Sequence, residues 1–95
     1  MTERKLVPDA VDEFLLYLET IKGFSPNTVV SYKNDLEKFK FFSGTQKYMD
    51  EITYNDLRYA IPCLTEQGSS SATINRYISA VRTLFAYCRK FDYID

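Results

Sequence analysis

The sequence predicts an all-α domain built from four helices. Apolar residues recur at spacings of three and four along most of the chain, which is the period of a helix and not that of a strand. Only three glycines and three prolines occur among the 95 residues, so few positions favour a break in a helix. Hydrophobic residues make up 45% of the chain, which is enough for one modest core. We therefore expect residues 1–95 to form a single domain.

The first helix is expected over residues 10–22, beginning at Asp9 or Ala10 directly after Pro8. Gly23 is expected to end it. One stripe of this helix is apolar and should face the core: Val11, Phe14, Leu15, Leu18 and Ile21. Its other face is acidic and should be solvated: Asp12, Glu13 and Glu19.

The second helix is expected over residues 26–42, with Ser25 as the N-cap and Pro26 at the first helical position. It should end near Ser43 and Gly44. Its apolar stripe consists of Val29, Tyr32, Leu36 and Phe39, with Phe42 close by.

The third helix is expected over residues 54–66, with Thr53 as the N-cap and Asp56 three residues later in a capping box. Pro62 falls inside this helix, where its missing N–H and its ring should bend or interrupt the backbone over residues 58–62. Gly68 closes the segment.

The fourth helix is expected over residues 71–90, after a run of three serines that offers several N-caps. Its stripe is the longest in the chain: Ile74, Tyr77, Ile78, Val81, Leu84, Phe85 and Cys88. We expect truncation of Ile78 to alanine to cost core packing, about 2–5 kcal/mol.

Charge is distributed unevenly although the total is nearly neutral. Twelve basic and 13 acidic residues give a net charge of −1. The segment 67–91 nevertheless holds four cations and no acid, whereas the segment 9–20 holds four acids and no cation. If the protein binds a polyanion, one face must do so.

The residue inventory argues against an enzyme acting alone. The chain has no histidine, which is the commonest general base and metal ligand, and it has no glycine-rich phosphate loop. We therefore expect no catalytic residue, no metal and no cofactor. Cys63 and Cys88 lie outside any metal-binding spacing and are expected to be reduced thiols in the core. With no apolar run of about 20 residues, a cytoplasmic protein without a membrane partner is expected.

Polar groups suited to nucleic acid lie on the outer faces of two helices. The second helix presents Asn27, Thr28, Ser31 and Asn34, and the fourth presents Thr73, Arg76 and Ser79. Hydroxyls, amides and guanidinium groups bind phosphates and base edges, and a helix N-terminus adds partial positive charge. Simple capping and solubility explain the same pattern equally well on physical grounds.

Two segments together resemble a known family. They are FLLYLETIKGFSPNTVVSYKNDLEKFKFF and ITYNDLRYAIPCLTEQGSSSATINRYISAVRTLFAYC, and they cover nearly the whole chain. Their order and spacing of caps and core residues are similar to the N-terminal core-binding domain of tyrosine recombinases, the phage-integrase family with its Xer-type members. The resemblance implies a four-helix, SAM-like orthogonal bundle that forms one jaw of a DNA clamp near the crossover site.

The resemblance also implies a set of DNA contacts and partners. By carry-over, these contacts are Asn27, Thr28, Ser31 and Asn34 from the second helix, and Ser71, Thr73, Arg76 and Ser79 from the fourth. Arg82 either reaches a phosphate or pairs with an acidic neighbour in the bundle. The implied partners are duplex DNA, a C-terminal catalytic domain absent from this chain, and other recombinase protomers in the DNA-bound assembly.

Two expectations remain open to test at this point. Arg76 is expected on the outward face of the fourth helix, so its replacement by alanine should weaken DNA binding with little effect on stability. The competing function is a small helical protein-interaction domain without DNA binding, which would use exposed aromatic residues such as Tyr48, Tyr54, Tyr59 or Phe91.

Overall fold

The computed structural model describes residues 4–94, and it confirms the all-α fold class. Its four α-helices are α1 (Val7–Thr20), α2 (Pro26–Ser43), α3 (Tyr54–Glu66) and α4 (Ser71–Lys90). One short 3-10 helix, η1 (Met49–Glu51), lies in the connection between α2 and α3. Among the described residues, no helix is both long enough and apolar enough to cross a bilayer.

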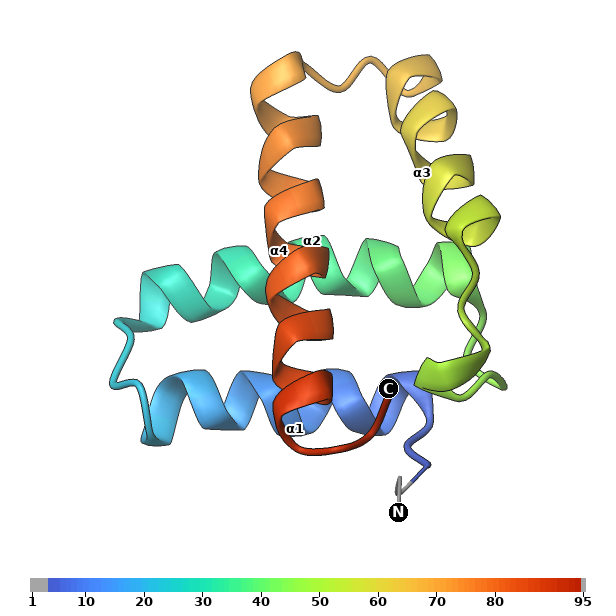
Figure 1. Ribbon diagram of the computed structural model, residues 1–95. Coiled ribbons are helices and arrows are strands. Elements are labelled where there is room, and N and C mark those ends of the chain that lie inside the picture. The colour runs from blue at the N-terminus through green and yellow to red at the C-terminus, as the bar shows by residue number, and fades with distance from the viewer. Residues whose placement is uncertain (1–3, 95) are drawn as a thin grey trace.

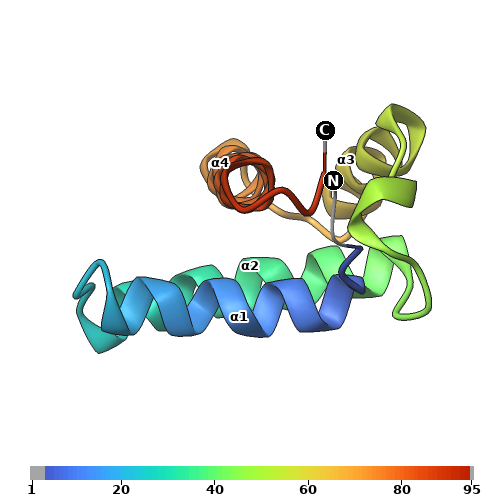
Figure 2. The same ribbon diagram turned by 60° about the horizontal axis from the view of Figure 1, so that its bottom comes forward.

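The helices are arranged in two layers that cross one another. α1 and α2 run antiparallel and side by side in one layer, while α3 and α4 lie together on one side of that layer (Figures 1 and 2). α4 runs across both α2 and α1, so its N-terminal half extends past α2 and its C-terminal half lies over α1 (Figure 1). This crossing gives the bundle its orthogonal form and leaves α2 and α4 in contact where they cross.

The core lies between the two layers and is built largely from the predicted stripes. Phe14 of α1 is 1% exposed, and its ring centre lies 5.3 Å from that of Tyr87 and 5.9 Å from that of Tyr32. Leu36 of α2 and Leu84 of α4 are fully buried. Together these residues join three helices in one apolar cluster.

The two cysteines differ in their surroundings. Both are free thiols, but Cys88 is buried whereas Cys63 is only partly buried. Burial raises the pKa of the Cys88 thiol to about 12, so this side chain is neutral at physiological pH and packs as a small apolar group.

The first helix differs from its predicted bounds at both ends. It begins at Val7 and not at Asp9 or Ala10, because Pro8 fits within the first turn, where its missing N–H needs no partner. It ends at Thr20, and Ile21 follows as a C-cap that is 71% exposed. The assignment of Ile21 to the core stripe was therefore wrong.

The third helix is not interrupted by its proline. α3 continues from Tyr54 to Glu66 with Pro62 inside it. The proline removes the N–H that would bond to the carbonyl of Arg58. Because Pro62 is exposed, water can reach that carbonyl, and the helix tolerates the missing bond.

A polar cluster fastens the start and the end of the described chain to α1. The Tyr87 hydroxyl donates a 2.8 Å hydrogen bond to Glu13 Oε2, and Lys5 Nζ lies 3.5 Å from Glu13 Oε1. Partial burial by itself would raise the pKa of Glu13. The hydroxyls of Tyr93 and Tyr87 and the charge of Lys5 together outweigh that effect, so the pKa of Glu13 lies below its ordinary value.

Because of this cluster, the free energy of unfolding depends on pH. A carboxyl group with a lowered pKa in the folded state stabilises the fold above its ordinary pKa, and that contribution is lost as pH falls through the folded value. We expect Tyr87→Phe to cost about 1 kcal/mol at neutral pH, because the ionised carboxylate loses one donor. The variant should also lose less stability than the wild type on acidification to about pH 3. Urea unfolding at both pH values measures this, and equal acid sensitivity in the two proteins would contradict it.

Candidate nucleic-acid interface

A groove of about 230 Å³ opens where α2 and α4 cross. From α2 it is lined by Thr28, Ser31, Tyr32 and Asp35, and from α4 by Arg76 and Ser79. Ala80 of α4 completes the lining, and four of the seven lining residues belong to the predicted DNA-contacting set: Thr28, Ser31, Arg76 and Ser79. The fold therefore brings together polar groups that lie more than 40 residues apart in the sequence.

The two helices that line this groove begin in the same way. Ser25 Oγ accepts the backbone N–H of Thr28 at 3.3 Å and lies 3.0 Å from Thr28 Oγ1. Ser70 Oγ accepts the N–H of Thr73 at 3.2 Å and donates to Thr73 Oγ1 at 3.0 Å. Each cap satisfies one free N–H group, and neither first turn contains an acidic residue. The partial positive charge of both N-termini is thus left without a local carboxylate.

An ion pair joins the two helices within the groove. Arg76 Nε and Nη2 donate to the two carboxylate oxygens of Asp35 at 2.9 Å and 3.1 Å. Asp35 is fully buried, whereas the Arg76 side chain remains 53% exposed. The hydrogen bonds to Asp35, followed by the charge of that carboxylate, raise the pKa of Arg76. Two-point pairing fixes the plane of the guanidinium, and its remaining N–H groups stay open to solvent.

This pair corrects the expectation that Arg76 is an unpaired surface cation. The side chain is exposed, but it is also the partner of the buried Asp35. Removal of the guanidinium would leave a carboxylate buried without its counter-charge, so Arg76 contributes to the fold as well as to the surface.

The other predicted residues lie around the groove in different ways. Asn27 and Asn34 are exposed on α2, and their spacing from Ser31 places them on the same face. Thr73 is half-buried in the first turn of α4, where its hydroxyl accepts a hydrogen bond from the N-cap Ser70. Asn75 was missed by the sequence reading, although it is exposed four residues before Ser79 and shares its side of α4.

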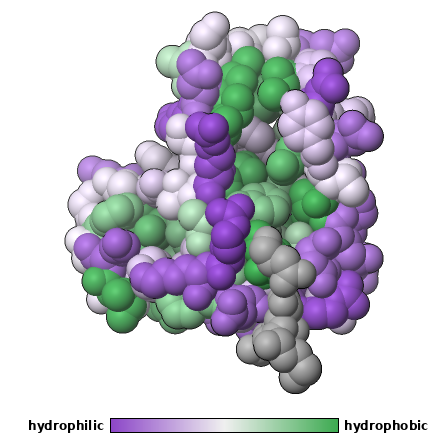
Figure 3. All heavy atoms as spheres, viewed as in Figure 1, coloured by the Kyte–Doolittle hydropathy of each residue, from purple (hydrophilic) through white to green (hydrophobic). Residues whose placement is uncertain are grey.

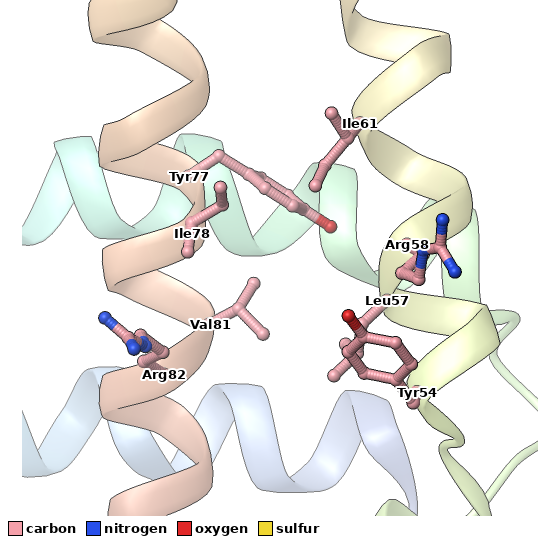
Figure 4. A pocket seen from close by; sticks show the side chains of 8 residues that line it. All are labelled: Tyr54, Leu57, Arg58, Ile61, Tyr77, Ile78, Val81 and Arg82. Carbon is pink, nitrogen blue, oxygen red and sulfur yellow. The ribbon is translucent and has the colours of Figure 1, made fainter.

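Two predicted residues of α4 lie away from the groove. Arg82 follows Arg76 by six residues, which places it about 120° further around the helix, and it borders a different groove between α3 and α4 (Figure 4). Ser71 is exposed on a similar side of the helix, five residues before Arg76. Within residues 4–94, Arg82 forms no ion pair with the bundle, so that alternative for this residue was wrong.

Comparison with known families decides which group of proteins shares these features. A family model described as "Phage integrase, N-terminal SAM-like domain" matches residues 11–90, which includes all four α-helices in whole or in large part. The chain belongs to this family. The resemblance noted from the sequence is thereby confirmed.

Curated relatives of this integrase N-terminal domain are named as tyrosine recombinases. The tyrosine recombinase XerC of Oceanobacillus iheyensis is 33% identical over 87 residues, which cover 90% of this chain and 28% of that protein. XerC of Alcanivorax borkumensis is 38% identical over 77 residues, covering 81% of this chain and 25% of the relative. XerD of Staphylococcus haemolyticus is 29% identical over 85 residues, covering 87% and 29%. The chain thus spans less than a third of these relatives, and no solved structure matches it.

Proposed function

We propose that this integrase N-terminal domain binds duplex DNA through the groove between α2 and α4, as the clamping part of a site-specific tyrosine recombinase. The observation that carries the proposal is the convergence of Thr28, Ser31, Arg76 and Ser79 in one groove between two helix N-terminal halves. The partners would be duplex DNA near the crossover site, a catalytic domain of the same protein and further protomers, within the cytoplasm.

The chemistry of the groove suits a phosphate backbone and base edges. Arg76 is held by Asp35 in a fixed orientation while part of its guanidinium faces solvent, and a fixed guanidinium can bind a phosphate oxygen or a guanine edge. The hydroxyl groups of Ser31 and Ser79 lie beside it, and Asn27 and Asn34 extend the polar face along α2. Small side chains of this kind allow a helix to approach a groove of DNA closely.

The domain is expected to bind DNA without cleaving it. Its tyrosines do not lie in a cluster with histidine, since the chain has none, and we assign no nucleophile to any of them. One paired guanidinium and a net charge of −1 predict weak, salt-sensitive affinity for the isolated domain.

NMR titration with a short duplex tests this proposal. At low salt, amide signals of α2 and α4 around the groove should shift, and the logarithm of the affinity should fall linearly with the logarithm of salt concentration. Shifts confined to the acidic face of α1, or no shifts at low salt, would overturn it.

A charge placed in the groove gives a sharper test. Ser79→Asp should weaken DNA binding at least about tenfold, because a carboxylate beside Arg76 repels phosphate and competes for the guanidinium. Thr45→Asp is the matched control, since it adds the same charge at an exposed loop position beyond the other end of α2. Binding is measured by fluorescence anisotropy of a labelled duplex, with circular dichroism as the check of folding. Equal losses in both variants would show that only net charge matters.

A further inference from the structure

A second hollow, of about 330 Å³, continues the surface of the groove between α2 and α4 toward the C-terminal end of α4. The two hollows share Tyr32. The side chains of α4 that line them follow one another at spacings of three and four, so they form one continuous face of the helix: Ser79, Thr83, Ala86 and Lys90. This face lies on the side of the turn between α1 and α2, where the surface mixes hydrophobic and hydrophilic side chains (Figures 1 and 3).

Aromatic rings form the floor of this second hollow. The ring centres of Phe24 and Tyr32 are 6.2 Å apart, and those of Tyr17 and Tyr87 are 4.9 Å apart. All four residues line the hollow. A long basic side chain can lay its apolar stem on such a floor while its charged end stays in water.

Two lysines border the hollow, Lys22 from the turn after α1 and Lys90 from the last turn of α4. Lys90 Nζ lies 5.9 Å from the centre of the Tyr17 ring. Both lysines are exposed, and within residues 4–94 neither forms an ion pair and no carboxylate lines the hollow. The hollow therefore presents two positive charges to an anion that approaches it.

The same two lysines also fit a purely structural role. Lys22 follows the end of α1 and Lys90 lies in the last turn of α4, and the partial negative charge at a helix C-terminus favours a nearby cation. That role acts on folding alone, so it predicts no change in affinity for DNA when the lysines are removed. A binding measurement therefore separates the two roles.

We propose that Lys22 and Lys90 bind the phosphate backbone of the same duplex that occupies the groove between α2 and α4, an inference that rests on the proposed function. Lys90 follows Arg76 by 14 residues, which is about 21 Å along α4. Because this separation exceeds the width of the major groove, about 12 Å, the lysines reach a phosphate that Arg76 cannot. Phosphate contacts at both ends of one helix face would fix the direction of α4 on the DNA.

The salt dependence of binding tests this proposal. In fluorescence anisotropy with a labelled duplex, Lys22→Ala/Lys90→Ala should weaken binding at least about tenfold at low salt. It should also reduce the slope of log affinity against log salt by about 1 to 2, because one or two phosphate contacts are lost. Lys22→Arg/Lys90→Arg keeps both charges and should bind like the wild type.

Lys33→Ala/Arg58→Ala is the matched control. It removes the same total charge at two exposed positions that line neither hollow, so its slope should equal that of the wild type. Circular dichroism verifies that each variant folds. An equal loss of affinity in the control and in the lysine variant would show that only net charge matters, and would overturn the proposal.

NMR titration distinguishes failure of this inference from failure of the proposed function. In the wild type, amide signals of the groove between α2 and α4 and of residues 22–24 should shift together. In Lys22→Ala/Lys90→Ala, the groove signals should still shift at higher DNA concentration, whereas those of residues 22–24 should not. Groove shifts combined with an unchanged salt slope in the lysine variant would refute this inference and leave the proposed function standing. A wild type without shifts at low salt would refute both.

Discussion

Replacement of Arg76 by alanine should lower the free energy of unfolding by about 2–3 kcal/mol, in addition to weakening DNA binding. The reason is Asp35, which is fully buried and whose two carboxylate oxygens both accept hydrogen bonds from this one guanidinium. Loss of one partner of a buried ion pair costs about 3–5 kcal/mol. We expect a smaller figure here because Arg76 is half exposed, so water can enter where its side chain stood. Urea unfolding followed by circular dichroism measures the change.

Arg82→Ala is the matched control for this variant. It removes the same side chain from the same helix, but at an exposed position that forms no ion pair within residues 4–94, so it should change stability by less than about 0.5 kcal/mol. The double variant Asp35→Leu/Arg76→Met should recover much of the loss, because no unpaired charge is then buried. If Arg76→Ala lowered the free energy of unfolding no more than Arg82→Ala does, the ion pair with Asp35 would contribute nothing to the stability of the fold.

The sequence predicted well those features that depend on local pattern. Ser25 and Thr53 act as N-caps as expected, because a capping side chain bonds to an N–H only two or three residues away. The bounds of the third and fourth helices and the buried stripe of the fourth follow from spacing and caps in the same way. At the end of the first helix, the apolar Ile21 follows the periodic stripe by spacing, but the helix ends before it.

The candidate site depended on contacts that spacing cannot reveal. Asp35 lies next to Leu36 at the edge of an apolar stripe, and nothing local shows that a guanidinium 41 residues away will cover it. Arg76 and Arg82 look equivalent in the sequence, since both are arginines beside the core stripe of one helix. Only the crossing of α4 over α2 turns one of them toward Asp35 and the other toward the α3–α4 groove.

Leu84→Ala should be the most destabilising aliphatic truncation in α4, with a loss of about 3 kcal/mol. Leu84 is fully buried within the core cluster, so its removal leaves a cavity that the close-packed surroundings cannot fill. The sequence assigned Ile78 to the same stripe with an equal role. The structure places Ile78 at the edge of the open α3–α4 groove, only partly buried.

Ile78→Ala is therefore the internal comparison, and the structure lowers its expected cost from the value of about 2–5 kcal/mol inferred from the sequence to about 1 kcal/mol, because water already reaches the site and no closed cavity forms. Thermal and urea unfolding of both variants measure the difference. A loss for Ile78→Ala as large as that for Leu84→Ala would mean that α3 closes over α4 in solution.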